Sequence, residues 1–156
     1  MGRRLVVLML LALGVSTATV GVPQPTNSTV LAQRLASGEQ LMRAGDYQSA
    51  ISQFRRALQI DPNSPDAHHY LGWCYLRTDQ LKYAVSSFST ALTVAPGLTS
   101  ARRGLGIAYY RLGRYRESVV ALRPIMGDLA GDVEMQLVYG RSLLAIGQAQ
   151  EAASDS

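Results

Sequence analysis

The hydrophobic pattern of the chain is helical from about residue 30 onward. Apolar residues recur at intervals of three and four, which is the period of one face of an α-helix. Gly45, Gly113 and Gly147 can each take the left-handed conformation that closes a helix. Pro62 and Pro96 cannot continue a helix. The pattern therefore predicts a series of short amphipathic helices and no β-sheet.

The helical pattern also repeats, with a period of 34 residues. Glycines occur at positions 38, 72, 106 and 140, and each is counted here as position 8 of a unit. Position 20 then holds small residues, namely Ala50, Ala84, Ser118 and Ala152. Position 24 holds large apolar residues, namely Phe54, Phe88 and Leu122. Small residues let helices approach closely, and large residues fill the space between them. Each unit is therefore predicted to be a pair of packed helices that stacks on the next pair.

Local signals refine the predicted boundaries. Ser64 can cap a helix that begins at the next residue, a proline. Pro124 lies inside the second helix of the third unit and is expected to kink or end it near Arg123. Asp132 suits the cap position of the fourth unit, in which Gly147 is expected to close the first helix. Because nine residues follow Gly147, the second helix of this unit is predicted to be little more than two turns long.

The second unit resembles the tetratricopeptide repeat family. The signature positions are filled in register by Leu71, Gly72, Tyr75, Ala84, Phe88, Ala91 and Pro96. The resemblance covers about residues 31–154 and implies an all-α fold, a right-handed α-solenoid of antiparallel helix pairs with about 3.5 repeats. It places the repeats at about residues 31–64, 65–98, 99–132 and a partial 133–156, within a domain of residues 30–156.

The first 22 residues have the layout of an export signal. Two arginines precede nine uninterrupted apolar residues, Leu5 to Leu13, and the small residues Ser16 and Ala18 suit a cleavage site. We therefore expect an exported protein, periplasmic or secreted, with a linker at residues 23–29. The alternative is an uncleaved membrane anchor, because the segment approaches the roughly 20 residues of a spanning helix if its small and polar residues are included.

Composition and charge exclude some partners. The formal net charge is +4, and the basic residues form no cluster of the kind that nucleic-acid binding needs. We therefore expect no nucleic-acid partner. Cys74 is the single cysteine, so the chain has no internal disulfide, and the repeat register predicts that Cys74 is buried.

The stretch around Cys74 contains residue types that bind metals or take part in catalysis. His68 and His69 are adjacent, so on a helix they point about 100° apart, and no fourth ligand stands nearby to complete a zinc site with Cys74. No nucleophile, base and orienting group recur at a suggestive spacing. We expect no metal, no cofactor and no catalytic residue, and an enzyme is the least favoured class of function.

The resemblance implies a binding surface on the inner side of the solenoid, built mainly from positions 2, 5, 6, 9, 12 and 13 of each first helix. The candidates on this concave face are His69, Tyr70, Trp73, Arg77, Arg103, Ile107, Tyr110, Arg111 and Arg141. Aromatic residues and arginine dominate the binding energy at interfaces, so we expect a protein or peptide partner with acidic and apolar side chains. The arginines at position 13 also have a structural interpretation, because a cation offsets the negative end of a helix dipole.

One ligand class of the family is not expected here. Members that grip the acidic tail of cytosolic chaperones use Lys and Asn at positions 5 and 9 of one repeat, Asn at position 6 of the next, and Lys and Arg at positions 2 and 6 of the third. The corresponding residues of this chain are Leu35, Glu39, Tyr70, Ser100 and Gly104. The sequence therefore lacks this clamp.

These patterns predict an exported scaffold that binds a peptide or protein segment in its concave groove. The alternative is a membrane-anchored assembly subunit whose uncapped C-terminal face packs on another subunit, because the last apolar face of a solenoid otherwise has no neighbour. The same open end allows the chain to form an oligomer.

Overall fold

The computed structural model describes residues 24–154, and this part of the chain is all-helical. It contains seven α-helices, one short 3-10 helix and no strand: α2 (Asn27–Arg43), α3 (Tyr47–Ile60), α4 (Pro65–Arg77), α5 (Leu81–Val94), α6 (Thr99–Arg111), α7 (Tyr115–Leu122), η1 (Arg123–Ile125) and α8 (Val133–Ser154). The predicted export signal or anchor at residues 1–22 lies outside the described residues. None of the described helices is both long and apolar enough to span a membrane.

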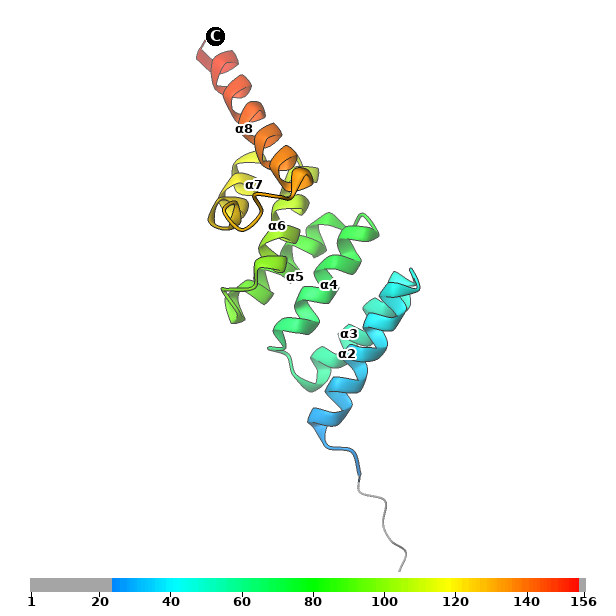
Figure 1. Cartoon of the computed structure of the whole chain (residues 1–156). Coiled ribbons are helices and arrows are strands. Elements are labelled where there is room, and N and C mark those ends of the chain that lie inside the picture. The colour runs from blue at the N-terminus through cyan, green and yellow to red at the C-terminus, as the bar shows by residue number, and fades with distance from the viewer. Residues whose placement is uncertain (1–23, 155–156) are drawn as a thin grey trace, which may run out of the picture.

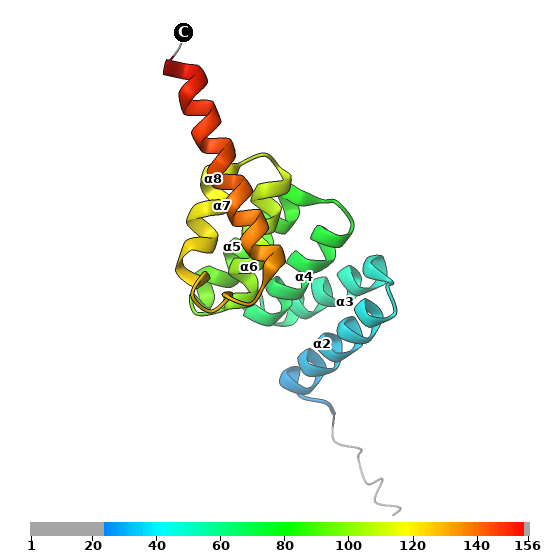
Figure 2. The ribbon, with the colours of Figure 1, turned by 45° about the horizontal axis from the view of Figure 1, so that its top comes forward.

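The helices form pairs that stack into a solenoid. Each helix packs on its neighbours in sequence, and the first helices of successive pairs also touch, α2 on α4, α4 on α6 and α6 on α8. Figures 1 and 2 show this succession from α2 at one end to α8 at the other. Three complete pairs are followed by the single helix α8. The prediction of an all-α stack of helix pairs is confirmed for the described residues.

A residue in the left-handed backbone conformation ends the first helix of each complete pair. Gly45 and Gly113 have φ angles of 80° and 73°, as predicted, and Asp79 occupies the corresponding place with a φ angle of 60°. Aspartate tolerates this conformation better than most residues that carry a Cβ atom. The second helices α3 and α5 end at Ile60 and Val94, each two residues before a proline, which also agrees with the sequence.

Side-chain caps begin four of the described helices, among them α3, where Asp46 accepts a hydrogen bond from the Ser49 N–H at 3.0 Å. Ser64 and Asp132 each accept a hydrogen bond from the backbone N–H three residues ahead, at 3.3 and 3.1 Å, at the predicted starts of α4 and α8. At the start of α2, the Thr26 hydroxyl accepts one from a backbone N–H at 3.3 Å, so the helix begins at Asn27. The prediction of a linker over residues 23–29 is therefore wrong at its end, because the last three of these residues are helical.

The third pair is shortened at its second helix. α7 ends at Leu122, and the 3-10 turn η1 replaces its continuation. Pro124 has no backbone N–H to donate and its ring would clash with the preceding turn of an α-helix. The predicted end of this helix near Arg123 is confirmed.

One apolar side chain from each second helix is wedged tightly against a first helix. A Cβ atom added to Gly72 would lie 2.6 Å from the ring of Phe88, and one added to Gly104 in the next repeat would lie 2.2 Å from the same ring. Phe88 is completely buried. Glycine is therefore needed on both sides of this ring for the helices to approach. The contact at position 8 recurs in the other pairs, between Gly38 and Phe54 and between Gly106 and Leu122.

The predicted core is buried. The signature residues Leu71, Gly72, Tyr75, Ala84, Phe88 and Ala91 have little or no exposed surface. Cys74, predicted to be interior, is fully buried among them as a free thiol. The core continues under α8 as a second apolar cluster that includes Leu122, Ile125 and Met135.

The fourth repeat departs from the prediction. The glycine pattern predicts a turn at Gly147 followed by a short second helix, but α8 runs without a break from Val133 to Ser154. That prediction is wrong. A second helix forms stably only if it buries an apolar face, and the residues after Gly147 offer little more than alanine for this purpose. Continuing a helix through one glycine costs only about 1 kcal/mol relative to alanine.

The wedge can be tested by adding one carbon atom to Gly72. We expect Gly72→Ala to lower the free energy of unfolding by about 1–3 kcal/mol, because the new Cβ overlaps the buried Phe88 ring. Gly97→Ala is the matched control, since a Cβ there meets no atom within 4 Å, and it should change stability by less than about 0.5 kcal/mol. Urea denaturation measures the free energy of unfolding of both variants. Equal values would contradict a tight contact between Gly72 and Phe88.

Candidate peptide-binding surface

A pocket of about 390 Å³ opens between the first helices of successive repeats. Its wall comes from Trp73, Leu76 and Arg77 on α4, from Arg103, Ile107 and Arg111 on α6, and from Glu134 on α8. We call it the Trp73 pocket. Five of the nine residues predicted for the concave face meet in it, namely Trp73, Arg77, Arg103, Ile107 and Arg111.

Hydrogen bonds fix Trp73 within the pocket. Its indole Nε1–H donates to Nε2 of His69, one turn earlier on α4, at 2.9 Å. The Ser100 hydroxyl on α6 lies 2.9 Å from the same nitrogen. Because an indole N–H can only donate, this histidine nitrogen is an acceptor and the ring is neutral. The indole also packs edge-on against Phe88, with ring centroids 5.5 Å apart.

His69 therefore links two repeats as a neutral side chain. Burial lowers the pKa of His69 below its usual value of 6.5, although the negative charge of Asp66 acts in the opposite direction. A proton on Nε2 would leave the Trp73 N–H without its acceptor. The geometry and the lowered pKa agree that His69 is uncharged at neutral pH.

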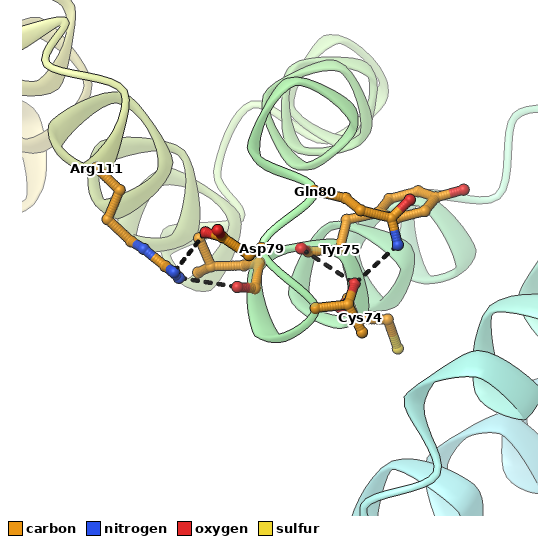
Figure 3. A network of polar contacts seen from close by, with 7 residues as sticks. Cys74, Tyr75, Asp79, Gln80 and Arg111 are labelled. Atoms are coloured by element: carbon orange, nitrogen blue, oxygen red, sulfur yellow. Dashed lines mark hydrogen bonds and ion pairs between the residues drawn. The ribbon is translucent and has the colours of Figure 1, made fainter.

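Arg111 joins the third repeat to the second. Its Nη1 donates to the carbonyl oxygen of Leu76 at 2.8 Å, and its Nη2 donates to Oδ1 of Asp79 at 2.7 Å (Figure 3). The Leu76 carbonyl belongs to the last turn of α4, where helix carbonyls lack partners within the helix. Arg111 thus caps the preceding first helix from outside. This contact fits the structural interpretation of the arginines at position 13.

The other arginines of the pocket also have partners in the chain. Arg103 lies 3.2 Å from a carboxylate oxygen of Asp132 and 3.6 Å from one of Glu134, at the start of α8. The guanidinium of Arg77 lies over the Tyr47 ring, 5.4 Å from its centroid. The rim of the pocket is therefore less positive than the sequence suggests. Glu134 stays largely exposed, with 70% of its side-chain surface accessible.

The remaining candidates are not part of the pocket wall. Tyr70 stacks on Phe54, with centroids 5.2 Å apart, and so faces the first repeat. Tyr110 contacts Tyr115 and the apolar cluster under α8. Arg141 is exposed on α8. These placements leave their predicted roles in binding as predictions.

Three residues of this site were not among the sequence candidates, namely Leu76, Glu134 and Asp79. Glu134 occupies position 2 of the fourth repeat, which the family register assigns to the inner surface, so its place could have been deduced. Asp79 carries no such signal. It stands where the other repeats have glycine, and only the structure shows that its carboxylate meets Arg111.

The candidate metal ligands of the α4 helix have separate partners. The His68 ring hydrogen bonds with the carbonyl oxygen of Pro62 at 2.9 Å, and His69 bonds with Trp73. Burial raises the pKa of the Cys74 thiol to about 12, so it carries no thiolate at neutral pH. Within residues 24–154, no three His, Cys, Asp or Glu side chains are grouped to hold a metal ion.

Part of the sequence matches a known family. Residues 41–85, from the end of α2 into α5, match the sequence model of the tetratricopeptide repeat. A comparison with curated protein sequences gave no match.

Solved structures match over most of the chain. The TPR domain of Sgt2 from Aspergillus fumigatus has a TM-score of 0.69 and 22% identity, and the match covers 83% of this chain and 85% of that one. The second TPR domain of human RPAP3, in complex with an HSP70 peptide, has a TM-score of 0.69 and 15% identity, and the match covers 75% of this chain and 98% of that one. The first TPR of Spaghetti (RPAP3), bound to an HSP90 peptide, has a TM-score of 0.70 and 18% identity, and the match covers 78% of this chain and 99% of that one. These matches confirm the predicted right-handed solenoid fold.

The neutral state of His69 predicts a dependence of stability on pH. The unfolded chain, whose histidine pKa is near 6.5, takes up a proton more readily than the folded chain. The free energy of unfolding should therefore fall as pH drops from about 7.5 to about 5. His69→Gln should flatten this slope, because an amide does not titrate. The carboxyl groups of Asp46 and Glu117, whose pKa values are lowered by hydrogen bonds from Ser49 and Arg114, contribute at lower pH. Urea denaturation across this pH range measures the free energy of unfolding. If it falls with pH as steeply in His69→Gln as in the unchanged protein, His69 is not the neutral group that we assign.

Proposed function

This chain is a tetratricopeptide-repeat protein, and we propose that it is a non-enzymatic interaction scaffold that holds an extended peptide segment in the Trp73 pocket. The observation that carries the proposal is the meeting of five predicted residues from α4 and α6 around one pocket of about 390 Å³. Peptide ligands in two structural neighbours support peptide binding as the kind of activity.

The wall of the pocket suggests the chemistry of the ligand. Trp73, Leu76 and Ile107 offer apolar surface. The indole is already held by its hydrogen bond to His69, so little side-chain entropy is lost on binding. We infer that an apolar side chain of the ligand contacts this surface. Tryptophan and arginine are the residue types that most often dominate such interfaces.

An acidic group of the ligand fits the arginine rim. Arg103 is shared between Asp132 and Glu134, and the contact with Glu134 is long, at 3.6 Å, and exposed. Exposed ion pairs of this kind contribute at most about 1 kcal/mol. A ligand carboxylate can therefore displace Glu134 from Arg103 at small cost. Arg77 offers a second cation, because its contact with the Tyr47 ring leaves part of the side chain exposed.

The proposed ligand differs from the chaperone peptides of the structural neighbours. Leu35, Glu39 and Gly104 occupy positions at which the chaperone clamp of the family carries Lys, Asn and Arg. We therefore propose a different acidic and apolar segment, held at the Trp73 pocket.

The scaffold is proposed to act outside the cytoplasm. Support comes from the charged and apolar layout of residues 1–22, with an uncleaved anchor as the alternative. N-terminal sequencing of the native protein should give a start near Thr19. An intact Arg3 and Arg4 would contradict cleavage and favour a membrane-anchored subunit.

Peptide binding can be tested with a displayed library of random peptides selected on the purified protein. We expect the selected peptides to combine apolar and acidic residues. Trp73→Ala should weaken the affinity for these peptides by at least about tenfold, because it removes the indole from the apolar wall of the pocket. Arg56→Ala, an exposed change on α3 away from the pocket, is the control and should leave affinity unchanged. Fluorescence polarisation measures each affinity.

Arg111 separates a structural from a binding role within the same pocket. Arg111→Met should lower the free energy of unfolding by about 1–3 kcal/mol, because the Leu76 carbonyl and the Asp79 carboxylate each lose the hydrogen bond from the guanidinium. Its effect on peptide affinity should be smaller than that of Trp73→Ala. If selected peptides bind Trp73→Ala as well as the unchanged protein, the pocket is not the binding site.

A further inference from the structure

The outer side of α8 carries an apolar stripe that no described residue covers. Val133, Leu137 and Leu144 are 67%, 52% and 63% exposed, and the exposed Gly140 and the half-buried Gly147 complete the row. With 3.6 residues per turn, these five positions fall within a sector of about 80°. The sector lies opposite the buried residues of the helix, which include Met135, Val138 and Ser142. We call this row the α8 stripe.

Gly140 marks the stripe as a place for close helix contact. In the three complete repeats, a Cβ atom added to the glycine at position 8 would lie 2.4 to 2.6 Å from a large side chain of the second helix. Gly140 holds the same position in the fourth repeat, yet a Cβ there meets no described atom within 4 Å, and the same is true of Gly147. A glycine inside a helix is about 1 kcal/mol less favourable than alanine. Two such residues on one exposed stripe are consistent with a close neighbour outside the described chain.

The order of residues in the stripe indicates what that neighbour is. Leucine and glycine alternate along it as Leu137, Gly140, Leu144 and Gly147, with steps of three, four and three residues. When the row is read from its C-terminal end, the steps between residues are again three, four and three, but a glycine stands wherever the forward reading has a leucine. An antiparallel copy of the helix therefore places a glycine opposite each leucine. The stripe is therefore complementary to an antiparallel copy of itself, which is the condition for a two-fold symmetric interface.

We propose that two copies of this chain form a dimer by packing their α8 stripes antiparallel. In this register, Gly140 of each copy receives Leu144 of the other, and Leu137 of each copy fills the space beside Gly147 of the other. The steps of three and four match the seam of a two-helix coiled coil, in which each large residue inserts between residues of the facing helix. The contact repeats the leucine and glycine packing of Leu122 on Gly106 within the third repeat.

The shape of the molecule leaves room for this contact. α8 is the last helix that the structure describes, and its final turns extend beyond α7 in Figures 1 and 2. The five residues of the stripe are uncharged. Glu151, one turn beyond Gly147 in the same sector, is exposed and lies beside Val133 of the other copy in this register, at the end of the contact where water can reach its carboxylate. None of the five stripe residues lines the Trp73 pocket, so dimer formation and peptide binding use different surfaces.

Analytical ultracentrifugation of the purified protein tests the dimer with two variants, one that disrupts the leucine and glycine pairs and one that restores them. We expect a dimer at about 100 µM that dissociates on dilution. Gly140→Leu should weaken it by at least about tenfold, because leucine then meets leucine across the interface. The double variant Gly140→Leu with Leu144→Gly should restore the affinity to within about threefold, since the exchange recreates the complementary pairs in the opposite order.

The control is Gln59→Leu, which adds an exposed leucine on α3 and should not change the dimer. Circular dichroism of each variant checks that the helices are retained. A monomer at all concentrations, a dimer insensitive to Gly140→Leu, or a single variant that the exchange fails to rescue would each overturn the proposal. The last result would mean that a different helix covers the stripe.

Discussion

The structure depends on a single packing constraint, the insertion of one large side chain per repeat against glycine. Phe88 is enclosed by Gly72 of its own repeat and by Gly104 of the next, where any added carbon would overlap the ring. Phe54 similarly lies against Gly38 and stacks on Tyr70. The same side chain thus closes a helix pair and sets the distance to the following pair. Stacked pairs follow from this repeated contact rather than from separate interactions at each joint.

The inner surface follows from that spacing. Because α4 and α6 are held on either side of one ring, Ser100 comes within hydrogen-bond distance of His69, and the Arg111 side chain reaches the end of α4. Polar contacts between repeats are therefore secondary to the apolar wedge but fix its orientation. They also decide which side chains remain available, since most cations on this surface already have an acid, a carbonyl or a ring beside them.

The sequence was sufficient for the fold because its signals are local and repeat. Glycine, proline and the spacing of apolar residues determine where α4 and α5 begin and end without reference to distant contacts. The error at Gly147 arose because closing a helix there depends on whether a following helix can be buried, which a local pattern does not express. The site was predicted less completely. The register placed Trp73 and Ile107 on one surface, but the partners of Arg103 and Arg111 come from other repeats through side-chain conformations that no spacing rule contains.

The attachment of α8 has a consequence for how the molecule opens. In a stack of repeats, each unit is stabilised by its neighbours, and the described part of α8 has neighbours on one side only, mainly α6, α7 and the turn at Ile125. α7 is itself only eight residues long because of Pro124. Local fluctuations should therefore be largest at this end, with amide protons of α8 exchanging before those of α4. Since Asp132 and Glu134 hold Arg103 from the start of α8, such fluctuations would intermittently free one guanidinium at the edge of the inner surface.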